Sequence, residues 1–242
     1  MFFKSLQSVL RYSVFAYILA SAPTQASIII SGTRVVYAGN EKEVTVKLSN
    51  SGKAPVLAQS WIDTGDVDAK PEKINTPFIL TPPINRINAG KSQTLRLSYT
   101  GVPALPEDKE SVYWLNVLEI PPVNKNAAPN RLQVAFRTRI KLFYRPAALA
   151  DSEKAITAAE KIKWKKVGNT LIAENASPYY VSLVSISLQK NGQSTLLEGE
   201  MVAPYGKYEF KLKDNSAIQS GARIVYEYIN DWGAIKTVQA SL

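Results

Sequence analysis

Apolar and polar residues alternate along most of the chain after residue 27, and this period of two predicts β-strands. Residues 44–49 (VTVKLS) and 95–100 (LRLSYT) alternate in this way, as half-buried strands do. Turn signals such as Asn50-Ser51-Gly52 and Pro82-Pro83 separate these segments. Short strands punctuated by turns predict an all-β fold of the sandwich type.

Two later segments are more distinctive. Residues 112–120 (VYWLNVLEI) form a nearly continuous apolar run that ends at Pro121-Pro122, which predicts a core strand. Residues 132–144 predict a long strand with two different faces. Its apolar face carries Leu132, Val134, Phe136, Ile140 and Leu142, and its other face carries Arg131, Gln133, Arg137, Arg139 and Lys141.

The same strand pattern returns in the second half of the chain, after an Ala-rich stretch at residues 147–159 that we interpret as a linker with one short helix. Asn191-Gly192 is a strong hairpin signal. We therefore expect two domains, residues 27–146 and 147–242, each close to the ~100 residues of an immunoglobulin-like sandwich. The tryptophans are the natural core candidates of these Cys-free domains: Trp61, Trp114, Trp164 and Trp232.

The first 26 residues have the pattern of a secretory signal peptide. Lys4 and Arg11 precede a short apolar run at residues 12–20, and Thr24-Gln25-Ala26 offers a cleavage site. A membrane anchor is disfavoured, because a spanning helix needs ~20 apolar residues. We expect an exported protein, cleaved after Ala26, that does not insert into a membrane afterwards.

Composition removes several classes of chemistry. The 242 residues contain no His and no Cys, which excludes a disulfide framework, a thiolate nucleophile and a Ser-His-Asp triad. Lys and Arg outnumber Asp and Glu by 29 to 20. Export argues against nucleic acid as the partner of this basic surface, and most cations are dispersed, as on a solvated face. The exception is a group near the end of the two-faced strand: Arg137, Arg139, Lys141 and Arg145.

The remaining candidate catalytic and metal motifs are weak. Ser187 and Lys190 match a Ser-x-x-Lys pattern, but they lie in a predicted strand, where the two side chains point to opposite faces. Asp63, Asp66 and Asp68 lack the Gly and Glu that complete a calcium loop, so we interpret them as a surface turn. The sequence thus predicts a binding protein that is not an enzyme and uses neither metal nor cofactor.

A long apolar strand at an open sheet edge can pair with another chain, which is a liability unless pairing is its function. Several spaced blocks point to the second case, because together they resemble one family, the PapD-like periplasmic chaperones of the chaperone–usher pathway of pilus assembly. The blocks are 32–37 (GTRVVY), 58–63 (AQSWID), Pro82-Pro83 with Arg86, 110–122 (ESVYWLNVLEIPP), 140–146 (IKLFYRP), 177–182 (SPYYVS) and 229–233 (INDWG).

The resemblance implies two immunoglobulin-like domains arranged as a boomerang with a cleft between them. It implies that Arg34 and Lys141 lie in this cleft and bind the C-terminal carboxylate of a pilus subunit. It also implies that Leu132, Val134 and Phe136 are donor-strand residues, which complete a subunit sandwich that lacks its last strand. From sequence alone, these apolar residues could equally fill the protein's own core.

By the same resemblance, Glu110, Arg145 and Asp231 form a structural charge cluster between the domains. The nine residues from Val123 to Arg131 and the absence of a Cys pair resemble the short-loop subgroup, and Trp232 stands where many relatives carry Tyr. The implied location is the periplasm, and the implied partners are pilus subunits and an outer-membrane usher. Self-association of the free protein remains open, as does the alternative of a secreted carbohydrate-binding or adhesin-type sandwich.

Overall fold

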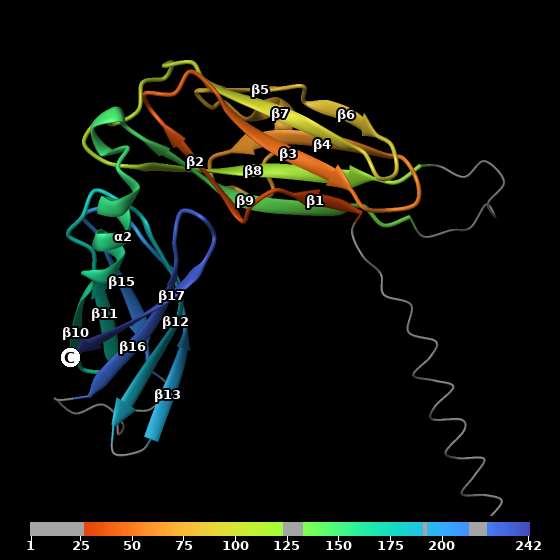
Figure 1. Cartoon of the computed structure of the whole chain (residues 1–242). Helices are drawn as coiled ribbons and strands as arrows, with labels where there is room; N and C mark the ends of the chain where they lie inside the picture. The colour runs from red at the N-terminus through yellow and green to blue at the C-terminus, as the bar shows by residue number, and fades with distance from the viewer. Residues whose placement is uncertain (1–26, 123–132, 191–192, 213–221) are drawn as a thin grey trace, which may run out of the picture.

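The computed structural model describes residues 27–122, 133–190, 193–212 and 222–242. Within these residues the strands form two β-sandwiches set at an angle, with the chain bending at the segment that carries helix α2 (Figure 1). The predicted all-β class, with two sandwiches in a boomerang, is confirmed. In the described part, no helix has the length and apolar character needed to cross a membrane.

The first sandwich packs two sheets face to face. One sheet has the order β1-β3-β7-β5, with β1 (Ile28–Ile30), β3 (Val44–Asn50), β7 (Ser92–Tyr99) and β5 (Phe78–Thr81). The other has the order β2-β9-β8-β4-β6, with β2 (Arg34–Ala38), β9 (Phe136–Arg145), β8 (Ser111–Ile120), β4 (Val56–Asp63) and β6 (Ile84–Ile87). A short 3₁₀ turn, η1 (Pro71–Lys73), follows β4.

The core of this sandwich comes from the alternating positions that the sequence indicates. Leu95 and Leu97 of β7 and Leu48 of β3 are buried. They belong to one apolar cluster with Leu115 of β8 and Leu142 of β9, which lie on the facing sheet. Alternation therefore places one face of each strand in the core and leaves the other for solvent or for a partner.

The second sandwich is built in the same way. One sheet has the order β10-β11-β15, with β10 (Lys163–Val167), β11 (Thr170–Glu174) and β15 (Lys207–Lys211). The other contains β13 (Gln193–Glu198), β12 (Val181–Lys190), β16 (Arg223–Ile229) and β17 (Ile235–Ser241), with β14 (Met201–Val202) paired to β12. The rings of Trp164 and Tyr226 pack against each other at a tilt in its core, with centroids 5.3 Å apart.

A short helical connection joins the sandwiches, as the Ala-rich stretch predicts. It consists of the 3₁₀ turn η2 (Ala147–Leu149) and helix α2 (Ser152–Glu160). Asp151 caps α2 by accepting a hydrogen bond from the backbone N–H of Glu153. The hydroxyl of Tyr226 donates to the carbonyl oxygen of Ala159 at 2.9 Å, so α2 is attached to the second sandwich.

Two expectations need correction. Trp232 is not a core residue, because its side chain is 67% exposed in the turn after β16; Trp164 is buried, whereas Trp61 and Trp114 are half-buried. The two-faced strand begins at Phe136 and not at Leu132, since residues 133–135 have no ladder partner. Leu132 itself lies outside the described residues.

Candidate functional site

Strand β9 has one edge that its own sheet covers only in part. Along one side, β9 pairs with β8 from Phe136 to Tyr144. Along the other side, the parallel strand β2 covers only Lys141 to Arg145. Among the described strands, none pairs with this second edge from Phe136 to Ile140, so its backbone groups are available to an added strand.

Apolar side chains accompany this open edge. Phe136 lies on the same face of β9 as Ile140 and Leu142, and Leu142 is fully buried in the core. Phe136 itself is 43% exposed, and Val134, just before the strand, is 50% exposed. The apolar face of β9 is thus buried in its own sandwich at Leu142 but exposed to solvent at Phe136.

Arg34 and Lys141 lie side by side where the open edge ends. They are register partners on the parallel strands β2 and β9, and both side chains are half-buried. Their neighbours Val35 and Leu142 are buried on the other face, in the core. Alternation therefore places both cations on the face that looks away from the core.

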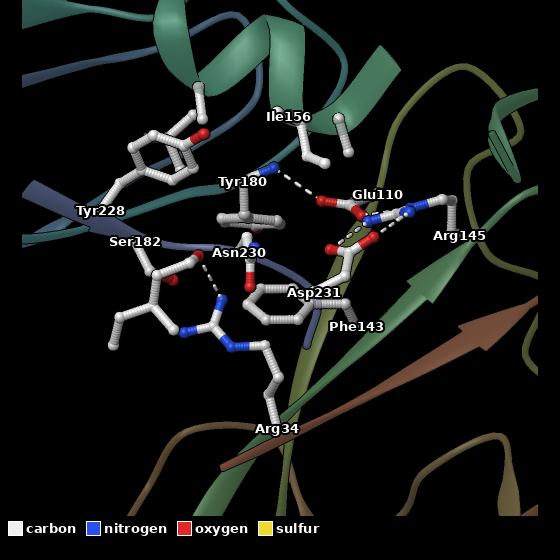
Figure 2. Close-up of a pocket in the computed structure, with 14 residues that line it drawn as sticks. Arg34, Glu110, Phe143, Arg145, Ile156, Tyr180, Ser182, Tyr228, Asn230 and Asp231 are labelled. Atoms are coloured by element: carbon white, nitrogen blue, oxygen red, sulfur yellow. Dashed lines mark hydrogen bonds and ion pairs between the residues drawn. The ribbon is translucent and has the colours of Figure 1, made fainter. Parts of the chain in front are cut away.

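Arg34 reaches across to the second sandwich, as Figure 2 shows. Its Nη1 donates to the carbonyl oxygen of Ile229 at 3.0 Å, and its guanidinium carbon lies 5.6 Å from the centre of the Phe143 ring. Its buried Nε has no hydrogen-bond partner among the described residues. A guanidinium carries five N–H donors, so this side chain still has donors to offer to a bound anion.

Burial and mutual repulsion strain this pair of cations. Burial lowers the pKa of Arg34, although the carboxylates of Asp231 and Glu110 partly offset this effect. Burial also lowers the pKa of Lys141, the nearby charge of Arg34 lowers it further, and Glu200 partly offsets both. An anion bound between the two side chains would relieve the repulsion and replace lost solvation.

A second charged cluster lies deeper, between the two sandwiches (Figure 2). Arg145, at the end of β9, is 2% exposed. Its Nε donates to Oε1 of Glu110 at 2.7 Å, and its two terminal nitrogens donate to the Asp231 carboxylate at 2.8 and 3.0 Å. Glu110 also accepts from the backbone N–H of Tyr180 at 2.7 Å. The three residues expected to form a cluster are therefore in contact and link the sandwiches.

The electrostatics of this cluster follow from its burial. Burial raises the pKa of Glu110, and the charge of Arg145 opposes that rise only in part. Burial lowers the pKa of Arg145. Hydrogen bonds and charges from Asp231 and Glu110 outweigh this effect, so the pKa of Arg145 is raised overall. Each side-chain nitrogen and oxygen of the cluster takes part in at least one hydrogen bond, which suits a structural role better than a catalytic one.

Arg34, Glu110, Arg145 and Asp231 also line a narrow pocket between the sandwiches. The space it leaves is ≈ 20 Å³, about what one water molecule needs and far less than a small-molecule site. The described residues contain no group of three or more His, Cys, Asp or Glu side chains placed to hold a metal ion.

Sequence reasoning missed a third cluster, which supports β9 beside Lys141. The carboxylate of Asp63, in β4, accepts from Arg139 at 2.5 Å and from Asn116 at 2.6 Å. The guanidinium of Arg139 stacks over the Trp114 ring at 4.6 Å. The Asp63 side chain is only 2% exposed, so its interpretation as a surface-turn residue was wrong; Asp66 and Asp68 are exposed. The opposite charges of Asp63 and Arg139 were the only signal in the sequence.

Ser187 lies in β12, within a β-ladder, and its hydroxyl contacts that of Ser194 at 2.9 Å. The side chain of Lys190, its supposed partner, lies outside what the structure describes. The expected strand placement of this motif is therefore observed, and the ladder gives no helical turn that would bring the two side chains to one face.

Comparisons with known proteins agree with this architecture. Residues 27–150 match the family model "Pili and flagellar-assembly chaperone, PapD N-terminal domain", and residues 157–240 match "Pili assembly chaperone PapD, C-terminal domain". The chain is 43% identical over 220 residues to the probable fimbrial chaperone YadV of Escherichia coli, covering 88% of this chain and 89% of that protein.

Solved structures give the same result. The crystal structure of the Pseudomonas aeruginosa CupB2 chaperone superposes with a TM-score of 0.76 at 39% identity, covering 88% of this chain and all of that one. The Salmonella enterica SafB chaperone, solved in complex with the SafA pilin, superposes with a TM-score of 0.74 at 27% identity, covering 91% and 99% of the two chains. On these grounds the chain belongs to the PapD family of pilus-assembly chaperones.

Proposed function

We propose that this chaperone lends the open edge of β9 to a pilus subunit whose own sandwich lacks a strand, while Arg34 and Lys141 hold the C-terminal carboxylate of that subunit. One observation carries the proposal: two half-buried cations, without a carboxylate of the described chain bonded to either, adjoin the uncovered edge of β9. A carboxylate offers two acceptor oxygens, for which Arg supplies a fork and Lys a mobile charge.

The apolar side chains at the open edge supply the second part of the binding energy. Val134 and Phe136 are exposed here and would enter the incomplete core of the subunit. Each fully buried apolar side chain contributes about 1.5–3 kcal/mol, and each charge-assisted hydrogen bond about 1.5–3 kcal/mol. We extend the donor role to Leu132 on the sequence pattern alone.

The two parts of the site act together through register. A slip of one residue would turn the donor side chains to the other face of the added strand, away from the subunit core. Because Lys141 lies on β9 itself, an anchored carboxylate fixes how far the subunit extends along the strand. The cations therefore set the register in which Val134 and Phe136 meet their groove.

Chaperones of this family are periplasmic in general, and our proposal includes the same location for this chain, after export and loss of residues 1–26. Its expected partners are pilus subunits and an outer-membrane usher that receives them. A secreted carbohydrate-binding or adhesin-type role is not favoured, because the similar proteins are named fimbrial chaperones.

The test is co-expression in the periplasm with a panel of pilus subunits, followed by co-purification. Arg34→Ala is expected to lose the complex, since truncating one side of a desolvated ionic contact costs about 2–5 kcal/mol. Arg96→Ala is the matched control, because Arg96 is an exposed arginine on the opposite sheet of the same sandwich. Equal recovery of complex with both variants would rule out the carboxylate site.

A further inference from the structure

Glu119 is a buried carboxylate at the far end of β8 from the cleft. Glu119 is 8% exposed and lies on the core-facing side of the strand, where an unpaired charge is energetically costly. No Lys or Arg nitrogen in the described part of the chain lies within 4.0 Å of its oxygens. A cation that would balance this buried charge is therefore not found among those side chains.

Within the described part of the chain, the hydrogen bonds that Glu119 accepts come from Ser27 and Ile28. Its Oε2 accepts from the backbone N–H groups of Ser27 and Ile28, both at 2.9 Å. Its Oε1 accepts from the hydroxyl of Ser27. The Glu119 carboxylate thus holds the chain at the start of strand β1.

Ser27 is held on its other side as well. Its carbonyl oxygen accepts from the backbone N–H of Ser51 at 2.8 Å and from the Ser51 hydroxyl at 3.1 Å. A Cβ built on Gly52 would lie 2.6 Å from the Cβ of Ser27, so the chain around this residue fits closely. The site is therefore shaped for one residue in one position.

Hydrolysis of the Ala26–Ser27 bond would change what Glu119 receives. The reaction, catalysed by a peptidase that removes the leader, consumes one water molecule, leaves a carboxylate on Ala26 and turns the Ser27 nitrogen into an ammonium group. That nitrogen already lies 2.9 Å from Oε2. It would then carry three donors and a positive charge in place of one amide N–H.

We propose that Glu119 is the binding site of the α-ammonium group of the processed chain, with Ser27 as the first residue. The ammonium supplies the counter-charge for the buried carboxylate, and removal of the leader completes the attachment of β1 to β8. Glu119 is also the register partner of Phe136, so this contact holds the end of the sandwich at which the open edge of β9 begins. The inference goes beyond subunit binding and does not depend on it, but it rests on the proposed export and loss of residues 1–26.

The experiment uses the exported protein, purified from the periplasm. Intact mass is expected to give Ser27 as the first residue. The α-amine is then labelled with an amine-reactive reagent near pH 7, where free α-amines react readily, and the N-terminal peptide is quantified. Labelling of the wild type is expected to be about 10-fold slower than labelling of Glu119→Gln, because the carboxylate holds the amine protonated.

Two further variants keep the test decisive. Glu43→Gln, at an exposed carboxylate on the same sandwich, is expected to label as slowly as the wild type. Insertion of one alanine between Ala26 and Ser27 keeps Glu119 but moves the free amine away from it, and is expected to restore fast labelling even if Glu119→Gln folds poorly. A first residue other than Ser27, or equal labelling rates in the wild type and the insertion variant, would overturn the proposal.

Discussion

Under the proposed function, Arg34 and Lys141 meet a binding requirement at the cost of local stability. Burial lowers the pKa of both side chains, and the nearby charge of Arg34 lowers the pKa of Lys141 further. A protein under selection for stability alone would place a carboxylate or an apolar residue at one of these positions. Their retention is understandable if an anion from outside completes the site.

The lowered pKa of Lys141 predicts that subunit binding weakens in alkaline solution. In the proposed complex, the ammonium form of Lys141 binds the carboxylate. In the free protein, burial and the charge of Arg34 bring the Lys141 pKa below its ordinary 10.5. Binding therefore favours proton uptake, and affinity falls as pH rises through this lowered pKa, by up to tenfold per pH unit beyond it. The complex is diluted at a series of pH values from 7 to 10, and size-exclusion chromatography measures the fraction that remains bound.

Lys141→Arg is the matched variant for this measurement, because arginine stays charged throughout the range. Its complex is expected to be weaker at pH 7, where the fork replaces a point charge, but to show a flatter dependence on pH. If the wild type and Lys141→Arg lose the complex in parallel between pH 8 and 10, titration of Lys141 is not the cause.

At the scale of the strand, β9 combines three roles in ten residues. Its end at Arg145 joins the sandwiches, its middle supplies Lys141, and its beginning at Phe136 presents apolar side chains at an open edge. An exposed apolar edge invites aggregation unless a partner covers it. The supporting contact between Arg139 and Asp63 ties β9 to β4 and so holds the strand in place without covering its edge.

The open edge predicts a variant that separates binding from stability. Val134 is 50% exposed, so Val134→Asp is expected to change the free energy of unfolding of the free protein by no more than about 0.5 kcal/mol. In a complex the same side chain would be buried, and an unpaired carboxylate there should abolish subunit binding. Denaturant unfolding and co-purification with the subunit measure the two effects.

Ile79→Asp is the control, because Ile79 is 58% exposed on β5, which lies on the other sheet. We expect it to leave both stability and subunit binding unchanged. A Val134→Asp protein that still co-purifies with its subunit, or an Ile79→Asp protein that does not, would argue against β9 as the donor strand.

The same strand shows what could and could not be predicted from the sequence. The period of two assigned residues 136–144 to two faces correctly, because alternation is a local property of the backbone. The beginning of the strand at Phe136 and the edge left open by β2 depend on pairing with distant residues, which no local pattern encodes. The buried contact of Asp63 with Arg139, 76 residues apart in the chain, was missed for the same reason.

Trp232 illustrates the opposite error. A large aromatic residue in a Cys-free sandwich is usually a core residue, but Trp232 lies in the turn after β16, which Asn230 shapes. The side-chain oxygen of Asn230 accepts from the backbone N–H groups of Trp232 and Ala234, at 3.2 and 2.9 Å. The turn lies beyond the sheet, where no second sheet among the described strands covers the side chain, so a prediction of burial from the residue type alone was wrong.

At the scale of the whole molecule, a contact between the sandwiches positions one member of the candidate site. Arg34 belongs to the first sandwich, but its hydrogen-bond acceptor, the carbonyl of Ile229, belongs to the second. Two residues after Ile229, in the turn that follows β16, Asp231 binds Arg145 from the first sandwich through both of its oxygens. The buried cluster therefore holds the segment that positions Arg34.

This arrangement predicts that Asp231→Asn loosens the angle between the sandwiches without unfolding either one. Arg145 keeps its bond to Glu110 in the variant, so the buried cation retains one carboxylate partner, while the charged two-bond link across the interface is weakened. The loss is expected to be about 1–3 kcal/mol of interface stability. Small-angle scattering should show a wider range of interdomain angles, and subunit co-purification should fall because Arg34 loses its fixed position.

Asp66→Asn, at an exposed site in the first sandwich, should change neither measurement. If Asp231→Asn lowers complex recovery while the scattering curve stays the same, Asp231 acts on the subunit directly and not through the angle between the sandwiches.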